Sequence, residues 1–314
     1  MTRVDVLTVG ETMMALRATG LIALGSGFTA SIAGAESNVA IGLSRLGHRA
    51  AWLGRVGADE PGRLVVRTLA AEGVDVSAVR RDDAAPTGLI MFEQRLPDVT
   101  RVHYVRAGSA GSRLSPQDVA AAPYEPAIVH LTGITPALGP SCRDAVRAAF
   151  ALAREHGARI SLDVNHRTRL WTRAEAARTL APLAEQADHV IASPDELMLL
   201  GPGDSPEAVA ARLLDGGATE VVVKDGAAGA CSYTAAGTRA VPAHAVQAVD
   251  SIGAGDGFAA GYLSGLLDGL DVEGRLRRAH TVGAFAVSTR GDWEGLPYRD
   301  ELDLIGLPEG AALR

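Results

Sequence analysis

Short apolar runs alternate along the chain with longer amphipathic segments. Several runs are apolar at successive positions, which is typical of strands that are buried on both faces of a parallel sheet. The predicted strands are V-D-V-L-T-V-G near the N-terminus, A-A-W-L-G-R-V-G around residue 51, and residues 127–133, 159–165, 189–193 and 220–224. Strand–helix alternation of this kind indicates β-α-β units, so it predicts an α/β fold with a doubly wound, mostly parallel sheet flanked by helices.

The segments between the predicted strands carry helix start and stop signals. Ser141 stands where it can cap a helix that bears Val146, and Gly157 follows the end of that segment. Pro61 lies near the start of an earlier amphipathic segment, which Gly73 closes. These signals predict one helix after Pro61 and another after Ser141.

Two segments do not fit the alternation. Residues 12–33 are rich in Gly, Ala and Thr with little helical period, and residues 86–106 have the pattern of two β-runs joined by a turn at Pro97-Asp98. They predict a small β-sheet lid (12–33 and 86–106) inserted into an α/β domain (1–11, 34–85 and 107–314). Ligands of open α/β sheets bind beyond the carboxyl ends of the strands, so a lid there would exclude water from a reaction.

Composition narrows the classes of partner. The chain has 314 residues, of which 47% are hydrophobic and 21% charged, which favours a large ordered core. Its net charge of −7 argues against nucleic acid or an acidic membrane as the main partner. No apolar run approaches the roughly 18 residues of a membrane span, and an acid interrupts the N-terminal apolar segment. We therefore expect a cytoplasmic protein that binds small molecules.

The spacing of the cysteines and histidines indicates neither a set of disulfides nor a metal site. Cys142 and Cys231 are the two cysteines, and they lie far apart without C-x-x-C spacing. The histidines show neither H-x-x-x-H nor H-E-x-x-H spacing, so a histidine-bound zinc ion is not indicated.

The run D-S-I-G-A-G-D-G-F-A-A-G-Y, from position 250, places Asp256 among glycines just before an apolar helical pattern. Free N–H groups at a helix N-terminus carry about half an elementary charge, and glycines let the backbone approach a ligand. The run therefore favours an oxyanion cradle. The alternative is that the glycines serve only close packing and that Asp256 complements the helix dipole. Neither a G-x-G-x-x-G fingerprint nor a P-loop occurs in this sequence.

A carboxylate beside an anion cradle points to phosphoryl transfer. Asp256 would repel a phosphate, but it is well placed to accept a proton from a hydroxyl group that attacks a phosphoryl group held there. The amides of residues 253–256 would then stabilise the transferring group.

This run resembles the C-terminal signature of the ribokinase-like (PfkB) sugar kinases, D-x-x-G-A-G-D-x-F. A-G-A-E-S-N-V-A at 33–40 is similar to the Gly-rich N-terminal signature of that family, with Ala33 in place of its first glycine. The resemblance extends from about residue 4 to residue 301. It implies a ribokinase-like fold, ATP with Mg²⁺, a sugar substrate, and a homo-oligomer formed through the lid.

Four further segments resemble the 2-keto-3-deoxygluconate kinases within that family. They are R-A-G-S-A-G-S-R-L (106–114), H-L-T-G-I-T-P-A-L (130–138), S-L-D-V-N-H-R-T-R-L-W (161–171) and R-G-D-W-E-G-L-P-Y-R (290–299). The resemblance implies that Tyr104, Arg106 and Arg167 hold the carboxylate of a sugar acid, a group that arginine binds bidentately. Ile90 stands where related kinases often carry a lid tyrosine.

The resemblance also assigns roles by position. It implies catalytic roles for Gly253, Ala254, Gly255 and Asp256, and substrate contacts for Gly34, Asn38 and Asp256. It implies nucleotide contacts for Ser193, Lys224, Gly226, Gly229, Gly253, Gly255 and His280. Glu196 would support Mg²⁺ indirectly, while Asp250 and Ile252 would surround a monovalent cation such as K⁺.

The expected reaction is the ATP-dependent phosphorylation of the 6-hydroxyl of 2-keto-3-deoxy-D-gluconate, with Asp256 as base. Two alternatives remain at this point. The chain could be a fructokinase or another PfkB sugar kinase, or it could be a sugar sensor without activity. The intact run from Gly253 to Asp256 argues against a sensor, which needs no base.

Overall fold

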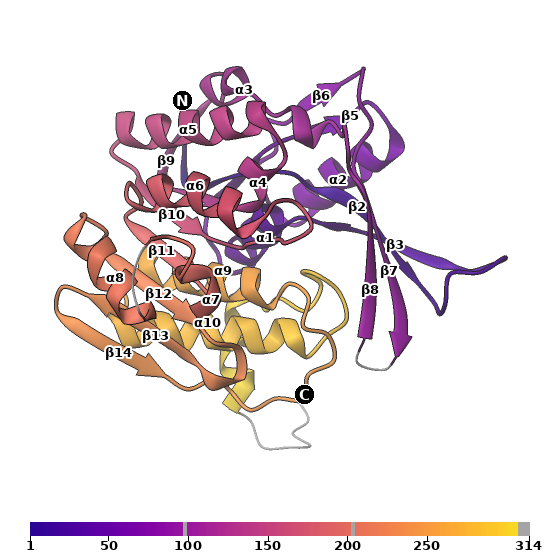
Figure 1. Ribbon diagram of the computed structural model, residues 1–314. Coiled ribbons are helices and arrows are strands. Elements are labelled where there is room, and N and C mark those ends of the chain that lie inside the picture. The colour runs from indigo at the N-terminus through magenta and orange to yellow at the C-terminus, as the bar shows by residue number, and fades with distance from the viewer. Residues whose placement is uncertain (97–98, 202–204, 307–314) are drawn as a thin grey trace.

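The computed structural model describes residues 1–96, 99–201 and 205–306 (Figure 1). Its largest sheet has eight strands in the order β14-β13-β12-β11-β10-β9-β1-β4. Neighbouring strands pair in parallel from β12 to β4, whereas β13 and β14 are antiparallel at one edge. The predicted fold class, a mostly parallel sheet flanked by helices, is confirmed.

The predicted apolar runs fall on the parallel strands of this sheet, with one difference. The run around residue 51 is divided at Gly54, so only its first part is a strand of this sheet and its second part belongs to a separate small sheet. The strands of the largest sheet are β1 (Thr2–Val9), β4 (Ala50–Leu53), β9 (Tyr124–Thr132), β10 (Arg159–Asp163), β11 (His189–Ala192), β12 (Glu220–Lys224), β13 (Ala230–Thr234) and β14 (Gly237–Val241). In β1, Leu7 and Val9 join the core on one face while Val6 joins the core on the other. This burial on both faces explains the nearly continuous apolar pattern of these strands.

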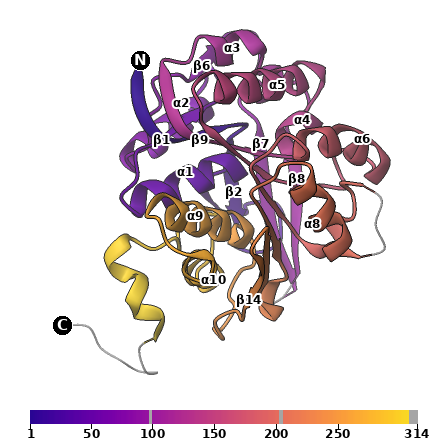
Figure 2. The ribbon, with the colours of Figure 1, turned by 90° about the vertical axis from the view of Figure 1, so that its left-hand side faces the viewer.

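Two layers of helices cover the sheet (Figures 1 and 2). One layer contains α1 (Ala35–Arg45), α2 (Glu60–Ala71), α9 (Ala254–Leu267) and α10 (Val272–Val287). The other contains α3 (Pro116–Ala120), α4 (Ile134–Ala137), α5 (Pro140–Glu155), α6 (Arg173–Ala184), α7 (Pro194–Leu197) and α8 (Pro206–Asp215). Across the described ranges, no helix has the length and apolar character needed to cross a membrane.

One helix start differs from its prediction. Helix α5 begins at Pro140 after Gly139, so Ser141 lies inside its first turn, where its hydroxyl donates to the Leu114 carbonyl over 2.8 Å. The fixed φ of proline suits the first helical turn, and this outweighs the capping preference of serine. Helix α2 fits its prediction, because it begins beside Pro61 and ends shortly before Gly73.

A second sheet forms a lid that projects from the main sheet (Figure 1). Its strands are ordered β3-β2-β7-β8, with bounds β2 (Met13–Ala18), β3 (Phe28–Ala33), β7 (Leu89–Leu96) and β8 (Val99–Val105). A small core of Met13, Ala15, Ala33, Ile90 and Phe92 holds it together. Ile90 is therefore a packing residue of the lid. The turn predicted at Pro97-Asp98 lies outside the described residues.

The remaining elements are short. β5 (Arg55–Gly57) and β6 (Arg80–Asp82) form a two-stranded parallel sheet, and the 3₁₀ helices are η1 (Gly111–Arg113), η2 (Gly226–Ala228) and η3 (Arg299–Gly306).

Candidate active site

The first turns of α1 and α9 meet at a buried carboxylate. Asn38, in the first turn of α1, donates from Nδ2 to Oδ2 of Asp256 over 2.8 Å, and Asp256 lies in the first turn of α9. The two residues are far apart in the sequence. They meet because strands and helices of an α/β fold present their loops at a common edge of the sheet.

Helix α9 begins with a glycine that no other residue could replace without strain. Gly253 is its N-cap, with a φ of 77°, and a Cβ atom there would overlap the carbonyl oxygen of Asp292. The following residues start the helix, so their amides project from its positive end. The start of α9 therefore has the geometry expected of an anion cradle, and its binding of an anion stays a prediction.

The surroundings of Asp256 increase the affinity of its carboxyl group for a proton. Asp256 is only 7% exposed, and this burial raises the pKa of its carboxyl group. The hydrogen bond from Asn38 and the charge of Arg167 partly oppose this rise, as do Lys224 and a hydrogen bond from Asn165. A carboxylate with a raised pKa accepts a proton more readily than an ordinary aspartate.

A buried lysine stands beside the cradle. Nζ of Lys224, the last residue of β12, lies 2.6 Å from Oδ2 of Asp163 at the end of β10. It would also lie 3.3 Å from a Cβ atom placed on Gly255. Burial would lower the pKa of Lys224, but the carboxylates of Asp163 and Glu196 raise it above its usual value. Lys224 is therefore a fixed cation at the N-terminal end of α9. A cation at this position suits the binding of a phosphate group.

The carboxyl group of Asp163 can contribute to a Mg²⁺ site. Burial raises the pKa of Asp163 to about 6, and its Oδ1 has no hydrogen-bond partner among the described residues. Mg²⁺ is usually bound by one or two carboxylates together with substrate phosphates, and it keeps several waters. The donor set fits that mode. Within the described ranges, no group of three or more acids, histidines or cysteines forms a complete metal cage.

The S-P-D-E segment is a capping box at the start of α7. Oε2 of Glu196 accepts the backbone N–H of Ser193, and Oε1 accepts the N–H of His166, each over 2.8 Å. Glu196 therefore fixes the loop after β10 while its charge acts on Lys224. This arrangement is compatible with the indirect magnesium role that the resemblance implies, which stays a prediction.

The loop after β10 holds a strained asparagine. Asn165 is the one non-glycine residue with a positive φ (37°) in the described parts of the chain, and it is buried beside Asp256. Such conformations cost energy and cluster at functional sites, although asparagine tolerates them better than most residues. The turn leaves Arg167 exposed, and its guanidinium has no hydrogen bond or ion pair to any described residue. Its charge is nevertheless close enough to act on the pKa of Asp256.

Arg106 and Tyr104, the other residues predicted to bind the substrate carboxylate, already have partners within the protein. Arg106 donates from Nε (2.8 Å) and Nη2 to the buried carboxylate of Glu11, and its guanidinium carbon lies 5.6 Å from the centre of the Tyr104 ring. Glu11 also accepts a hydrogen bond from Ser109. Arg106 therefore retains Nη1 for a ligand, whereas Arg167 retains its whole guanidinium.

Sequence reasoning missed Glu36, which lies inside the quoted A-G-A-E-S-N segment. This carboxyl group is fully buried, and Oε1 accepts hydrogen bonds of 2.7 Å from Thr132 and Thr135. Burial raises its pKa to about 7. Gly34, predicted to contact substrate, is the N-cap of α1, and a Cβ there would overlap the Glu11 carbonyl oxygen. The available signal for Glu36 was that it is the one acid in a helical segment with several apolar positions.

The predicted nucleotide residues of the K-D-G-A-A-G turn meet the end of β14. Gly226 and Gly229 have φ values of 51° and 107°, and a Cβ on Gly229 would overlap the Val241 carbonyl oxygen. His280 packs edge-on against Phe258 and donates from Nε2 to the same carbonyl over 3.2 Å. A nucleotide contact by His280 stays a prediction.

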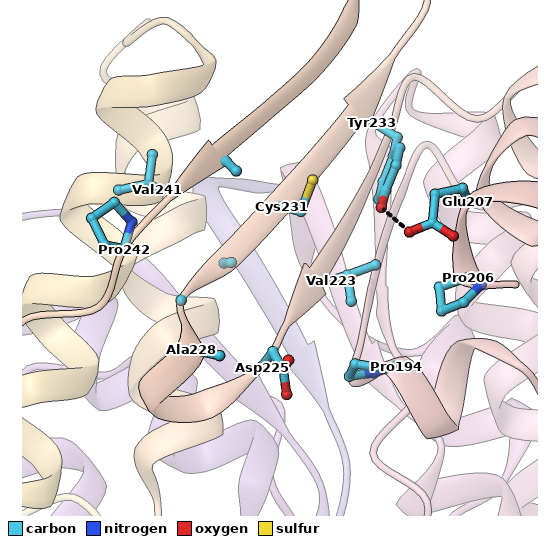
Figure 3. A pocket seen from close by; sticks show the side chains of 13 residues that line it. Pro194, Pro206, Glu207, Val223, Asp225, Ala228, Cys231, Tyr233, Val241 and Pro242 are labelled. Atoms are coloured by element: carbon cyan, nitrogen blue, oxygen red, sulfur yellow. Dashed lines mark hydrogen bonds between the residues drawn. The ribbon is translucent and has the colours of Figure 1, made fainter.

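A cavity of about 370 Å³ lies beside this turn (Figure 3). Asp225 and Ala228 line it from the turn, and Pro194 and Glu207 line it from α7 and α8. The hydroxyl of Tyr233 donates to Glu207 across it over 3.2 Å. Asp256 and Lys224 are not among its lining residues, whereas Val223 and Asp225, the neighbours of Lys224 in the chain, are.

The predicted cation site holds an arginine. Nη1 of Arg17 lies 3.1 Å from Oδ2 of Asp250, and its Nη2 lies 3.6 Å from Oδ1 of Asp292. Burial raises the pKa of Asp292 to about 8, and the charge of Arg17 opposes that rise. The side chain of Ile252 packs against the lid core. Nothing in the local sequence around Arg17 signals this contact.

A helix N-terminus with a buried carboxylate and a buried lysine beside it is an arrangement that suits phosphoryl transfer. Residues 3–299 match the pfkB family carbohydrate kinases, and the chain belongs to that family.

Named relatives agree with this assignment. A 2-dehydro-3-deoxygluconokinase from Bacillus subtilis is 38% identical over 306 residues, which cover 96% of this chain and 94% of that protein. The crystal structure of a PfkB protein from a Polaromonas species is similar with a TM-score of 0.84 and 37% identity, covering 96% of this chain and 99% of that one. A putative ribokinase II from E. coli, in complex with ATP and Mg²⁺, has a TM-score of 0.88 and 27% identity, covering 96% and 98%.

Proposed function

We propose that this protein transfers the γ-phosphoryl group of ATP to the 6-hydroxyl of 2-keto-3-deoxy-D-gluconate, which is 2-dehydro-3-deoxygluconate. The placement of Asp256 in the first turn of α9, hydrogen-bonded by Asn38 and within the influence of the Lys224 charge, is the observation that carries the proposal. The Bacillus subtilis relative supports the choice of substrate. The proposal includes ATP and Mg²⁺, which the E. coli structure contains, and a cytoplasmic location.

The chemistry follows from the positions of these groups. Asp256 accepts the proton of the 6-hydroxyl as the new P–O bond forms and the bond to ADP breaks. Asn38 holds Oδ2 of Asp256, and its own buried Oδ1 is free to accept a hydrogen bond from a hydroxyl group of the sugar. The amides at the start of α9 and Nζ of Lys224 stabilise charge on the transferring group. Mg²⁺ supplies further charge neutralisation between the ATP phosphates.

A panel of substrates tests this function. ADP release should be measured with 2-keto-3-deoxy-D-gluconate, its C4 epimer and fructose, and the phosphorylated carbon of the product should be located by ³¹P-coupled NMR. The sugar acid should have the highest kcat/KM and carry phosphate on C6. Faster turnover of fructose would instead assign a fructokinase, and sugar binding without turnover would assign a sensor.

The substrate carboxylate is proposed to bind Arg167, with Nη1 of Arg106 as a second donor. Arg167→Ala should raise the KM for the sugar acid by about 10- to 100-fold, since a charge-assisted hydrogen bond contributes about 1.5–3 kcal/mol. The KM for fructose should change far less, because a neutral sugar offers no carboxylate. Arg178→Ala, which removes an exposed arginine of α6, is the matched control. Equal increases for both substrates would contradict the assignment.

We also propose that two copies of the chain associate through the lid. Most of the exposed large apolar side chains of the described residues belong to the lid segments, and they include Leu21, Ile22, Leu24, Phe28, Leu96, Val99 and Val105. Exposed apolar patches of this kind mark interfaces. Light scattering after size exclusion should give a dimer, and Val99→Glu should shift it toward monomer. Tyr298→Glu, at an exposed position outside the lid segments, should leave the dimer intact. A wild-type monomer would exclude this association.

A further inference from the structure

Arg17 extends from the lid to two loops that carry the anion cradle. It lies on β2, and its guanidinium faces the carboxylates of Asp250 and Asp292, with Nη1 3.1 Å from the first and Nη2 3.6 Å from the second. The ring of Phe92 lies below it, 4.5 Å from the guanidinium carbon. The side chain is only a quarter exposed, so it is held between the lid and the main domain.

Both carboxylates lie directly behind the cradle. Asp250 accepts the N–H of Ile252 over 3.2 Å, one residue before the N-cap of α9. The backbone of Asp292 packs so closely on Gly253 that a side chain there would overlap its carbonyl oxygen. A displacement of either loop would therefore move the amides that start α9.

The loop that contains Asp292 is attached to the lid at two further points. The indole Nε1 of Trp293 donates to the carbonyl of Ile32 over 3.1 Å, and the hydroxyl of Ser31 donates to Glu294. The R-G-D-W-E segment is thus a junction between the lid and the cradle.

Arg17 faces a group of acidic side chains at this junction. Asp250, Asp292 and Glu294 are acids placed behind a site that must attract a negatively charged phosphoryl group. Among the described residues, Arg17 is the cation that forms ion pairs with Asp250 and Asp292. A monovalent metal ion bound to Asp250 would stand beside this guanidinium and be repelled by it. The residues present therefore do not fit the K⁺ site that the sequence resemblance implies.

We propose that Arg17 is the built-in cation of the anion cradle. It replaces a bound monovalent ion and couples the position of the lid to that of the amides that start α9. Arg17 is a positioning residue, since it acts through Asp250, Asp292 and Gly253. This inference rests on the proposed function, because it assigns a support to the same phosphoryl-transfer site.

Kinetics with and without K⁺ test the replacement. Wild-type turnover should be equal in KCl and in tetramethylammonium chloride at the same ionic strength. Arg17→Ala should lower kcat by about 10- to 100-fold, the loss expected when catalytic groups are slightly misplaced. KCl or methylguanidinium should restore part of that loss, and the KM for the sugar acid should change little. Arg101→Ala, which removes a lid arginine paired with Glu93, should keep wild-type turnover.

Either of two kinetic results would overturn the proposal. One is a wild-type enzyme that requires K⁺, and the other is an Arg17→Ala variant that turns over as fast as Arg101→Ala. Arg17→Lys keeps the charge but cannot reach both carboxylates, so it should retain more activity than Arg17→Ala and remain independent of K⁺. This variant also serves if the alanine variant does not fold.

Hydrogen exchange gives a readout that needs no turnover. The amides of residues 250–257 should exchange faster in Arg17→Ala than in wild type or Arg101→Ala, because the loops lose their link to the lid. If the wild type does not phosphorylate the sugar acid, the proposed function fails while this exchange still tests the role of Arg17. Unchanged exchange in Arg17→Ala would refute the link between lid and cradle.

Discussion

Asp256→Asn is expected to lower kcat by about 10²–10⁴ while leaving the KM for the sugar acid nearly unchanged, the range typical of a lost general base. Asparagine has the same shape, and its amide oxygen can still accept the hydrogen bond from Asn38. What it cannot do is take the proton of the attacking hydroxyl. Single-turnover measurements with ATP should show that the chemical step itself has slowed.

The pH profile gives a second test of this base. Burial raises the pKa of Asp256, so wild-type kcat should fall as the pH decreases, and it should do so at a higher pH than an ordinary aspartate would cause. The protonated carboxyl group cannot act as base, and Asp256→Asn should lack this acid limb. Asp195→Asn, at an exposed position in α7, should keep both the rate and the limb. Near-normal turnover in Asp256→Asn would remove Asp256 from the role.

The sequence predicts the parts of the fold that are buried on both sides. Residues 189–193 and 220–224 are continuous apolar runs because β11 and β12 lie in the middle of the sheet. The antiparallel strands β13 and β14 were not predicted. Strand β14 is exposed at every position except Val241, so its G-T-R-A-V segment lacks the apolar signal of a strand.

The residues of the candidate site also differ in whether the sequence alone predicts their positions. Gly253 and Asp256 belong to one contiguous run, so their placement at a helix start follows from local pattern alone. The contacts of Arg17 and Arg106 join segments far apart in the chain. An arginine on a half-exposed strand has the same local pattern whether it is solvated or paired with a buried acid. The partners Glu11 and Asp292 could therefore be found only from the folded arrangement.

Gly253→Ala is expected to lower kcat by about 10²–10³, comparable with the loss of an oxyanion-hole donor. Alanine is strained at a φ of 77°, and its Cβ would overlap the Asp292 carbonyl oxygen, so the loop or the start of α9 must shift. The amides then no longer point to the transferring phosphoryl group. The variant should also lose about 1–3 kcal/mol of unfolding free energy, measurable by urea denaturation.

The control variant Gly269→Ala distinguishes the effect of backbone strain from the effect of displacing the cradle. Gly269 follows the other end of α9 with a φ of 72°, and a Cβ there would meet no atom within 4 Å. This variant should lose stability through backbone strain alone and keep wild-type turnover. If both variants lose stability but only Gly253→Ala loses turnover, the defect lies in the position of the amides. Equal turnover in the two variants would mean that the start of α9 does not stabilise the reaction.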